Sequence, residues 1–156
     1  MAQGDYQSTQ AAIQASPTPS ALIDHGAFGG KARILNIDYT LTTSEASTEV
    51  LDLGELVKGD RVQVLNSSVY CPNPGTALVV DIGDDDSAGE DPDRYVDGLT
   101  LSAGGTFAFS EGGTASAALA TPYTVQNNCR LQLTFATATS LNAVKLQFSI
   151  VITNNS

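Results

Sequence analysis

Apolar side chains recur at every second residue through most of the chain, and this rhythm is the feature that most constrains its fold. Along 32–41 and again along 143–153, apolar residues alternate with polar ones, which places the apolar set on one face of an extended strand. An amphipathic helix needs apolar residues three and four positions apart, and no stretch shows a convincing pattern of that kind. The chain is therefore predicted to consist of strands.

Eight or nine short strands are predicted, separated by turns of glycine and small polar residues. The strand segments are 32–41, 48–54, 61–70, 76–83, 98–102, 105–113, 121–125, 129–137 and 143–153, with a chain reversal at 58–60. The inward-facing residues are predicted to be Leu35, Ile37, Tyr39, Leu41, Val62, Val64, Leu78, Val80, Ile82, Phe107, Phe109, Cys129, Leu131, Leu133, Phe135, Val144, Leu146, Phe148, Ile150 and Ile152.

The connections between these segments are short, which decides how the strands pair. Residues 138–142 form a short connector, so the last two strands are predicted to pair as an antiparallel hairpin. Parallel sheets need long crossover connections, usually helices, and none is visible. The predicted fold is therefore all-β, an antiparallel β-sandwich of jelly-roll or Greek-key type, with a closed barrel as the alternative.

The first thirty residues differ from the rest. Residues 1–30 are rich in Gln, Ser, Ala and Gly, and Pro17 and Pro19 favour extended backbone around them. We predict an extended N-terminal arm over 1–30, which could span up to about 100 Å and reach a neighbouring subunit, and a sandwich domain over 31–156. The beginning of the chain has neither a basic region nor an apolar run, so no signal peptide and no membrane span are expected.

The charge balance limits the partners. The net charge is −10 with only seven basic residues, which argues against binding to nucleic acid or to an anionic membrane surface. Cys71 and Cys129 lie far apart and in no metal-binding spacing. They are predicted to be two buried thiols, with a disulfide as the alternative.

Half of the acidic residues gather in or beside the segment 81–98, "DIGDDDSAGEDPDRYVDG". Asp84, Asp86 and Gly89 fall at positions one, three and six of a calcium loop, and Asp84, Asp86 and Glu90 are the calcium candidate. Position twelve is Tyr95 where a bidentate glutamate is needed, so the prediction is a polar turn excursion between strands. In that interpretation Asp84–Asp86 face solvent, Tyr95 anchors the loop, and changing the three aspartates to Asn leaves thermal stability nearly unchanged.

No catalytic constellation is apparent. His25 is the single histidine, so a nucleophile–histidine pair must use it, yet it lies in the arm, which is a poor place to hold a base in position. The glycine pairs at 29–30, 104–105 and 112–113 match no nucleotide-binding motif. We therefore predict that the chain is not an enzyme, has no catalytic residues and binds no cofactor.

Several segments in order resemble a known family. They are "GGKARILNIDYTLT" after the arm, "VLDLGELVKGDRVQVLNSSV", "TALVVDIGDDD" with "DPDRYVDGLTLSAGGTF", and a closing strand "FSIVITN". The motif residues are Leu53, Gly54, Leu56, Lys58, Gly59, Ile82, Gly83, Asp84, Asp93, Arg94, Tyr95, Asp97 and Gly98. Over about residues 29–153 the sequence resembles the head decoration, or capsid cement, proteins of tailed bacteriophages, although its acidic segment is longer than the family pattern.

The resemblance implies a structural virion protein that binds the outside of an expanded capsid, as a homotrimer, and holds capsomers together. Its partner would be the major capsid protein, and its location the capsid exterior after assembly in the host bacterial cytoplasm. Two alternatives remain open at this point: a β-sandwich associated with the tail, neck or fibres of the virion, and a module that binds glycans or other ligands.

Overall fold

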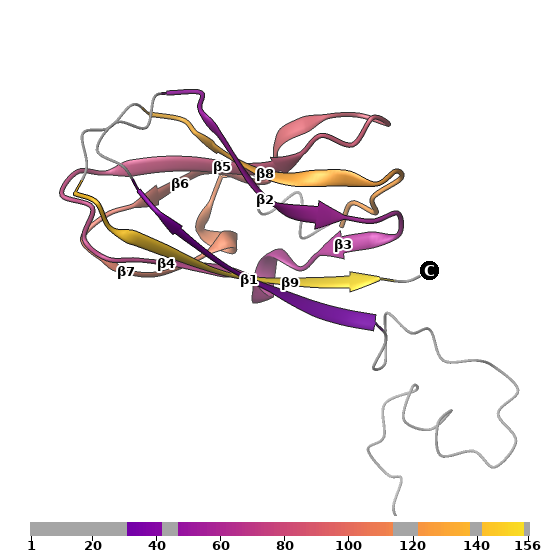
Figure 1. The fold of residues 1–156 in the computed structure, drawn as a ribbon, viewed down its shortest axis with the longest axis horizontal. Coiled ribbons are helices and arrows are strands. Elements are labelled where there is room, and N and C mark those ends of the chain that lie inside the picture. Colours follow the sequence, from indigo (N-terminus) through magenta and orange to yellow (C-terminus); the bar gives the residue numbers. More distant parts are fainter. Residues whose placement is uncertain (1–30, 42–46, 114–121, 138–141, 155–156) are drawn as a thin grey trace, which may run out of the picture.

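The computed structural model describes residues 31–41, 47–113, 122–137 and 142–154, and these form two antiparallel sheets packed face to face (Figure 1). The predicted β-sandwich is confirmed, and the described residues contain no α-helix, only two short 3-10 turns. The strands are β1 (Lys31–Thr40), β2 (Val50–Leu56), β3 (Asp60–Val62), β4 (Ser68–Cys71), β5 (Leu78–Asp84), β6 (Asp91–Leu101), β7 (Gly105–Ala108), β8 (Cys129–Phe135) and β9 (Lys145–Asn154). The 3-10 turns are η1 (Val64–Asn66) and η2 (Phe109–Glu111).

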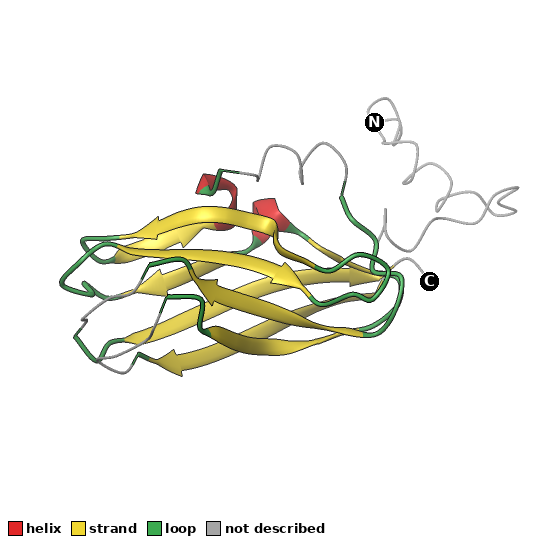
Figure 2. Cartoon of the chain, turned by 90° about the horizontal axis from the view of Figure 1, so that it is seen from above, coloured by secondary structure: helices red, strands yellow, loops and turns green. Residues whose placement is uncertain are grey.

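One layer, here called sheet A, has the order β1-β9-β4-β7, with β3 also paired to β9. The other layer, sheet B, has the order β2-β8-β5-β6. Figure 2 shows the two layers from above, with the strands of each running side by side along the long axis of the molecule. Among the described residues no helix is long and apolar enough to cross a membrane.

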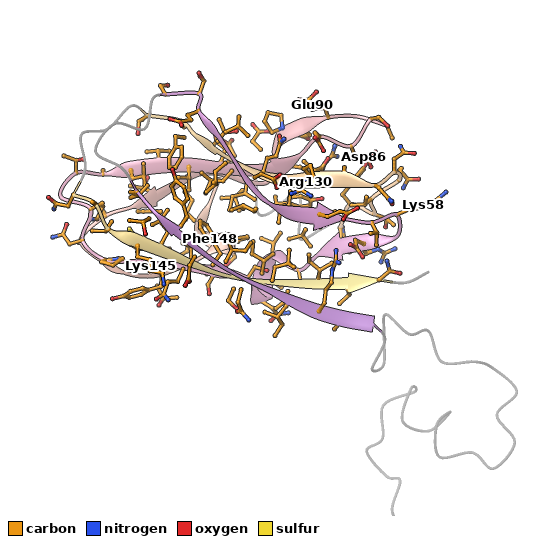
Figure 3. All side chains as sticks on the ribbon, in the orientation of Figure 1. Lys58, Asp86, Glu90, Arg130, Lys145 and Phe148 are labelled. Atoms are coloured by element: carbon orange, nitrogen blue, oxygen red, sulfur yellow. The ribbon has the colours of Figure 1, made fainter. Side chains whose placement is uncertain are left out.

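The apolar residues that recur at every second position form the core between the two sheets. On β9, Leu146, Phe148, Ile150 and Ile152 are buried, while Lys145 and Gln147 are exposed (Figure 3). The same alternation holds on β5 and β8, so the inward set predicted for these strands is confirmed. Cys71 and Cys129 are buried free thiols, as predicted, one in each sheet. Burial raises the pKa of both, that of Cys129 to about 12.

The predicted hairpin between the last two strands is wrong. β8 pairs with β2 and β5 in sheet B, whereas β9 pairs with β1, β3 and β4 in sheet A. Because the two layers of a sandwich lie about 10 Å apart, a short connector can cross from one sheet to the other as easily as it can turn within one. Sequence proximity alone could not distinguish these two paths.

The segment 61–70, predicted as one strand, is divided by η1 into two strands, β3 and β4, which both pair with β9. Between the pairs Val62–Ile152 and Ser68–Ser149 the chain advances six residues against three on β9, and η1 occupies the excess. The hydroxyl of Ser67 takes the place of a missing main-chain partner there. The Val151 N–H donates to Ser67 Oγ (3.0 Å), and Ser67 Oγ donates to the Gln63 carbonyl (2.8 Å). A buried strand N–H thus keeps a partner across the bulge.

Two further expectations differ from the structure. Residues 122–125 have no regular secondary structure, so the short strand predicted there is wrong for the part of it that is described. Phe109 is buried as expected, but it opens η2 instead of continuing β7. The predicted arm, residues 1–30 with His25, lies outside the described residues.

Candidate functional site

Much of the acidic segment 81–98 belongs to strands, and the loop within it is shorter than predicted. β5 continues to Asp84 and β6 begins at Asp91, so only residues 85–90 connect the two strands. The prediction of a turn excursion over 81–98 is therefore wrong at both ends. The reason is that main-chain pairing with neighbouring strands, including Asp84 with Leu131 of β8, outweighs the low strand propensity of aspartate.

Asp84 is fully buried at the end of β5. Its Oδ2 accepts hydrogen bonds from Tyr95 Oη (2.7 Å) and Arg94 Nε (2.8 Å), and its Oδ1 accepts from the Asp86 N–H (3.1 Å). Both side-chain donors come from β6, so the carboxylate ties β5 to the bulged start of its neighbour. A buried carboxylate is tolerated only when it is paired and hydrogen-bonded in this way.

Asp86 is the centre of a second set of contacts, with the segment 122–127. Its Oδ2 accepts from Tyr123 Oη (2.8 Å) and from the Gln126 N–H (2.7 Å), and its Oδ1 accepts from Asn127 Nδ2 (3.0 Å) and the Ala88 N–H (3.0 Å). Residues 122–127 belong to no strand. The Asp86 carboxylate therefore supplies the hydrogen-bond acceptor for the Gln126 N–H and for two of their side chains.

Arg94 joins the two aspartate sites. Its guanidinium bonds to Asp84 and to the Gly89 carbonyl, and it stacks on the ring of Tyr123 at 3.7 Å from the ring centre. A stacked arginine with charge-assisted hydrogen bonds is held in one orientation. We call Asp84, Asp86, Arg94, Tyr95 and Tyr123 the loop anchor.

Ionisation of the loop anchor follows from these contacts. Burial acts to raise the pKa of Asp86, but hydrogen bonds from Ala88, Gln126, Asn127 and Tyr123 outweigh it and hold that pKa well below its ordinary range. Burial and the neighbouring carboxylates raise the pKa of both tyrosines, that of Tyr123 to about 12. Asp86 therefore stays charged and the two phenols stay neutral at physiological pH, which suits a permanent structural contact.

The expectation that Asp84–Asp86 face solvent is wrong for Asp84 and Asp86, and Asp85 is half-buried. The expectation that Tyr95 anchors the loop agrees with its buried bond to Asp84. Sequence reasoning missed Tyr123, Gln126 and Asn127, which lie about forty residues away in the chain. The only signal was the unusual number of acidic residues, which cannot name a distant partner.

The calcium candidate joins residues with different surroundings. Asp84 and Asp86 point their carboxylates at protein donors, and Glu90 is exposed at the surface (Figure 3). Within the described ranges no group of three or more His, Cys, Asp or Glu side chains is arranged to hold a metal ion. Calcium binding by Asp84, Asp86 and Glu90, which the sequence offered only as a candidate beside the predicted polar turn, stays untested.

We expect the melting temperature to be the same in 2 mM EDTA and in 2 mM calcium, because the oxygens a calcium ion needs already accept hydrogen bonds from the protein. A site filled at one hundred times its Kd would add about 2.7 kcal/mol of stability. Differential scanning fluorimetry in the two buffers makes the comparison. A rise of several degrees with calcium, absent with magnesium, would restore the calcium interpretation.

A second buried carboxylate, Asp60, ties the same end of the sandwich together. Arg33 Nη2 donates to its Oδ2 (2.6 Å), as does the Val57 N–H (2.9 Å), and Asn154 Nδ2 donates to its Oδ1 (2.8 Å). The main chain of Asp60 also accepts from the Val125 N–H (2.9 Å). The segment 122–127 is thus held between Asp60 on one side and Asp86 on the other.

Three acidic residues of the segment 81–98, namely Asp81, Asp91 and Asp97, lie close enough to Asp93 for their charges to repel it. The pKa of Asp93 is raised to about 6 by a shared hydrogen bond with Asp91, by burial, and by the charges of Asp91, Asp97 and Asp81. Its folded-state pKa is above the unfolded value, so the folded state binds the extra proton. Stability from this group is present below about pH 4 and is lost as pH rises through about 6.

Asp93→Asn is therefore expected to remove this pH dependence. The parent should lose roughly 1 kcal/mol of unfolding free energy between pH 5 and pH 7, and the variant should lose little and be the more stable protein at pH 7. Urea unfolding at pH 5, 6 and 7 measures this, with the exposed Glu111→Gln as the control that keeps the parent's slope. Equal slopes in Asp93→Asn and the parent would show that the group does not titrate in this window.

The two outer faces of the sandwich differ in charge. On sheet A, Ile34 and Tyr70 are 58% and 45% exposed, and the charged side chains Asp38 and Lys145 pair with each other at 2.5 Å. On sheet B, Asp52, Glu55, Asp81 and Asp97 share the outer face, where Arg130 bonds to Asp52 at 2.5 Å. The face of sheet A is thus nearly neutral, and the face of sheet B, which also carries the exposed Val50, is acidic.

The fold and these anchors define a small antiparallel two-sheet β-sandwich. No protein-family model matches the chain, and no curated protein matches it. Among solved structures, it is similar to a chain of the cyanophage Pam1 capsid (15% identity, TM-score 0.56, 90% of this chain and 98% of that one). It is also similar to a chain of the Ralstonia phage GP4 capsid (16%, 0.55, 94% and 95%). A chain of the acid-stable capsid of Helicobacter pylori bacteriophage KHP30 is similar as well (18%, 0.51, 80% and 89%).

Proposed function

We propose that this chain is a structural virion protein that binds the outer surface of an expanded phage capsid and stabilises the contacts between capsomers. In this proposal it acts as a homotrimer, its partner is the major capsid protein, and it is not an enzyme. It is made in the host bacterial cytoplasm and ends on the capsid exterior. The observation that supports this most is the match, over nearly the full length of both chains, to chains of three phage capsids.

The share of each chain that the matches cover supports the role of an accessory capsid subunit. Because most of both chains is covered in each case, the matched chains are about as long as this one. A chain of this size can cover only a small part of a shell, which suits an accessory subunit. A protein that binds the assembled lattice, but not free subunits, stabilises the lattice by mass action, and many weak copies add up.

The nearly neutral face of sheet A is the surface we propose for capsid contact. Exposed aromatic and aliphatic groups such as Tyr70 and Ile34 contribute to binding because they lose contact with water without a large desolvation cost. The acidic face of sheet B would then point to solvent, where like charge keeps particles apart. The loop anchor keeps the fold rigid while the bound copy is under load.

Binding to purified expanded shells of the phage that encodes this chain tests the proposal. We expect saturable co-sedimentation at hundreds of copies per shell and a higher melting temperature of the decorated shell. Cryo-electron microscopy of the virion then locates the chain. Density on the tail, neck or fibres, with none on the shell, would support a sandwich associated with those parts of the virion. Glycan binding without shell binding would support a glycan-binding module.

Tyr70→Lys tests the contact face. Placing a charge on the neutral face is expected to weaken shell binding at least tenfold, since an unpaired charge would be desolvated in the contact. Thr100→Lys, exposed on the opposite sheet, adds the same charge and is the matched control that should bind like the parent. If Thr100→Lys weakens binding and Tyr70→Lys does not, the acidic face is the contact surface.

A further inference from the structure

The strand β1 is an edge of sheet A along its whole length. It pairs with β9 in an unbroken register from Lys31–Asn154 to Thr40–Lys145, and no described strand lies on its other side. The Leu41 N–H donates to the Val144 carbonyl, just before β9, at 2.9 Å. Hydrogen-bonded pairs alternate along an antiparallel ladder, so in this register the odd-numbered residues of β1 bond to β9. The N–H and C=O groups of Ala32, Ile34, Asn36, Asp38 and Thr40 therefore point to the open edge.

Among the described strands, the other edges of the sandwich are bulged, short or contain proline, and β1 has none of these three features. β6 has two register shifts against β5, carries Pro92, and accepts a hydrogen bond from the Gly113 N–H at Asp97. β2 is bulged at Asp52–Gly54, and β7 has four residues. Bulges, prolines and short length are the usual devices that prevent edge pairing. β1 has ten residues, no bulge and no proline.

The side chains of β1 also leave the core incomplete. Leu35, Ile37 and Tyr39 face inward but are only partly buried, while Phe148 and Ile150, their cross-strand neighbours on β9, are 2% and 0% exposed. Ile34, on the outer face, is 58% exposed. An added strand would cover the inward apolar groups and pair the open backbone at the same time, which is how peptides add to exposed sheet edges.

We propose that the open edge of β1 is a strand-acceptor site, and that its occupant is residues 8–16 of a second copy of this chain. This segment, "STQAAIQAS", has no charge and no proline, and Thr9, Ala11, Ile13 and Ala15 alternate with mostly polar neighbours. Thirty residues precede β1, enough for a strand of this length and a link to it.

The prolines that follow the segment favour a second copy over the same chain. By their intrinsic preference, Pro17 and Pro19 favour extended backbone just after the proposed strand and disfavour a tight return onto the β1 that follows. The inference rests on the self-association in the proposed function. Its experiments use isolated protein without capsids, so that its failure and the failure of shell binding are separate results.

Amide hydrogen exchange by NMR tests the occupant. In full-length protein at a concentration where it associates, the amides of Ala32, Ile34, Asn36, Asp38 and Thr40 should exchange at least tenfold more slowly than in a variant lacking residues 2–16. Dilution to the monomer should remove the protection. Fast exchange in the associated protein would overturn the proposal. Protection that persists in the monomer would instead assign the edge to the chain's own arm and would overturn the second copy as the occupant.

Asn36→Pro tests the site on the acceptor side. Proline removes an N–H that points to the open edge and leaves the bonds to β9 in place, so the fold should survive. We expect self-association, measured by sedimentation velocity, to need at least tenfold higher concentration. Asn36→Thr keeps the N–H and should associate like the parent, and equal association of both variants would overturn the edge as the acceptor. If Asn36→Pro lowers the melting temperature of the fold, the variant lacking residues 2–16 takes its place in the sedimentation measurement and should show the same loss of self-association.

Discussion

Asp86→Ala is expected to lower the free energy of unfolding by about 3–5 kcal/mol, because it removes a buried carboxylate and leaves four partly buried donors without their acceptor. The orphaned groups are the Tyr123 hydroxyl, the Gln126 and Ala88 N–H groups and the Asn127 amide. For a chain of this size the loss corresponds to a fall in melting temperature of roughly 10 °C. Thermal and urea unfolding, followed by circular dichroism, measure both quantities.

The control for Asp86 comes from the same loop. Glu90→Gln removes one negative charge four residues away at an exposed position, and it should stay within about 0.5 kcal/mol of the parent. A general effect of charge on the acidic loop would move both variants alike. If Asp86→Ala were as stable as Glu90→Gln, the loop anchor would not hold the segment 122–127.

Gly83→Ala is expected to destabilise the fold by about 3 kcal/mol or more, or to prevent folding, because a side chain at this position has no space. A Cβ on Gly83 would lie 2.0 Å from the Asp91 carbonyl oxygen and 2.3 Å from the Pro92 carbonyl carbon. Both are main-chain atoms of β6, so relief requires the two strands to separate. Yield of folded protein and urea unfolding report the effect.

Gly89→Ala is the matched control for Gly83. Gly89 lies in the connecting loop, its backbone is outside the left-handed region, and no atom lies within 4 Å of an added Cβ. The substitution should be neutral or stabilise by up to about 1 kcal/mol, because it restricts the unfolded chain. Equal losses at Gly83 and Gly89 would mean that loss of glycine flexibility, and not the close approach of β6, causes the effect.

The difference between these two glycines shows what a sequence can and cannot convey. Both stand in the same acidic segment, and composition gives no reason to treat them differently. Gly83 is critical because β6 bulges toward β5 just where Asp91 and Pro92 pass. That approach depends on three extra residues in the β6 register between Val96 and Asp91, which no local pattern records.

The alternation of apolar residues was sufficient to predict the class of fold and most of the core. Residues two apart in a strand share a face whatever the rest of the chain does, so the burial of Leu146, Phe148 and Ile150 could be derived locally. Which strands pair could not, as β8 and β9 show, because a connector of a few residues can turn within a sheet or cross between sheets.

The sequence by itself determined an all-β fold whose core is carried by strands, because that core depends on a period of two and on nothing distant in the chain. Only the tertiary structure decided that Asp84 and Asp86 are buried anchors and that β1 is an edge strand among the described residues. Both depend on which segments meet across long separations in the chain: an aspartate faces water or a tyrosine according to what packs beside it, and an edge is open only when no other strand arrives to cover it.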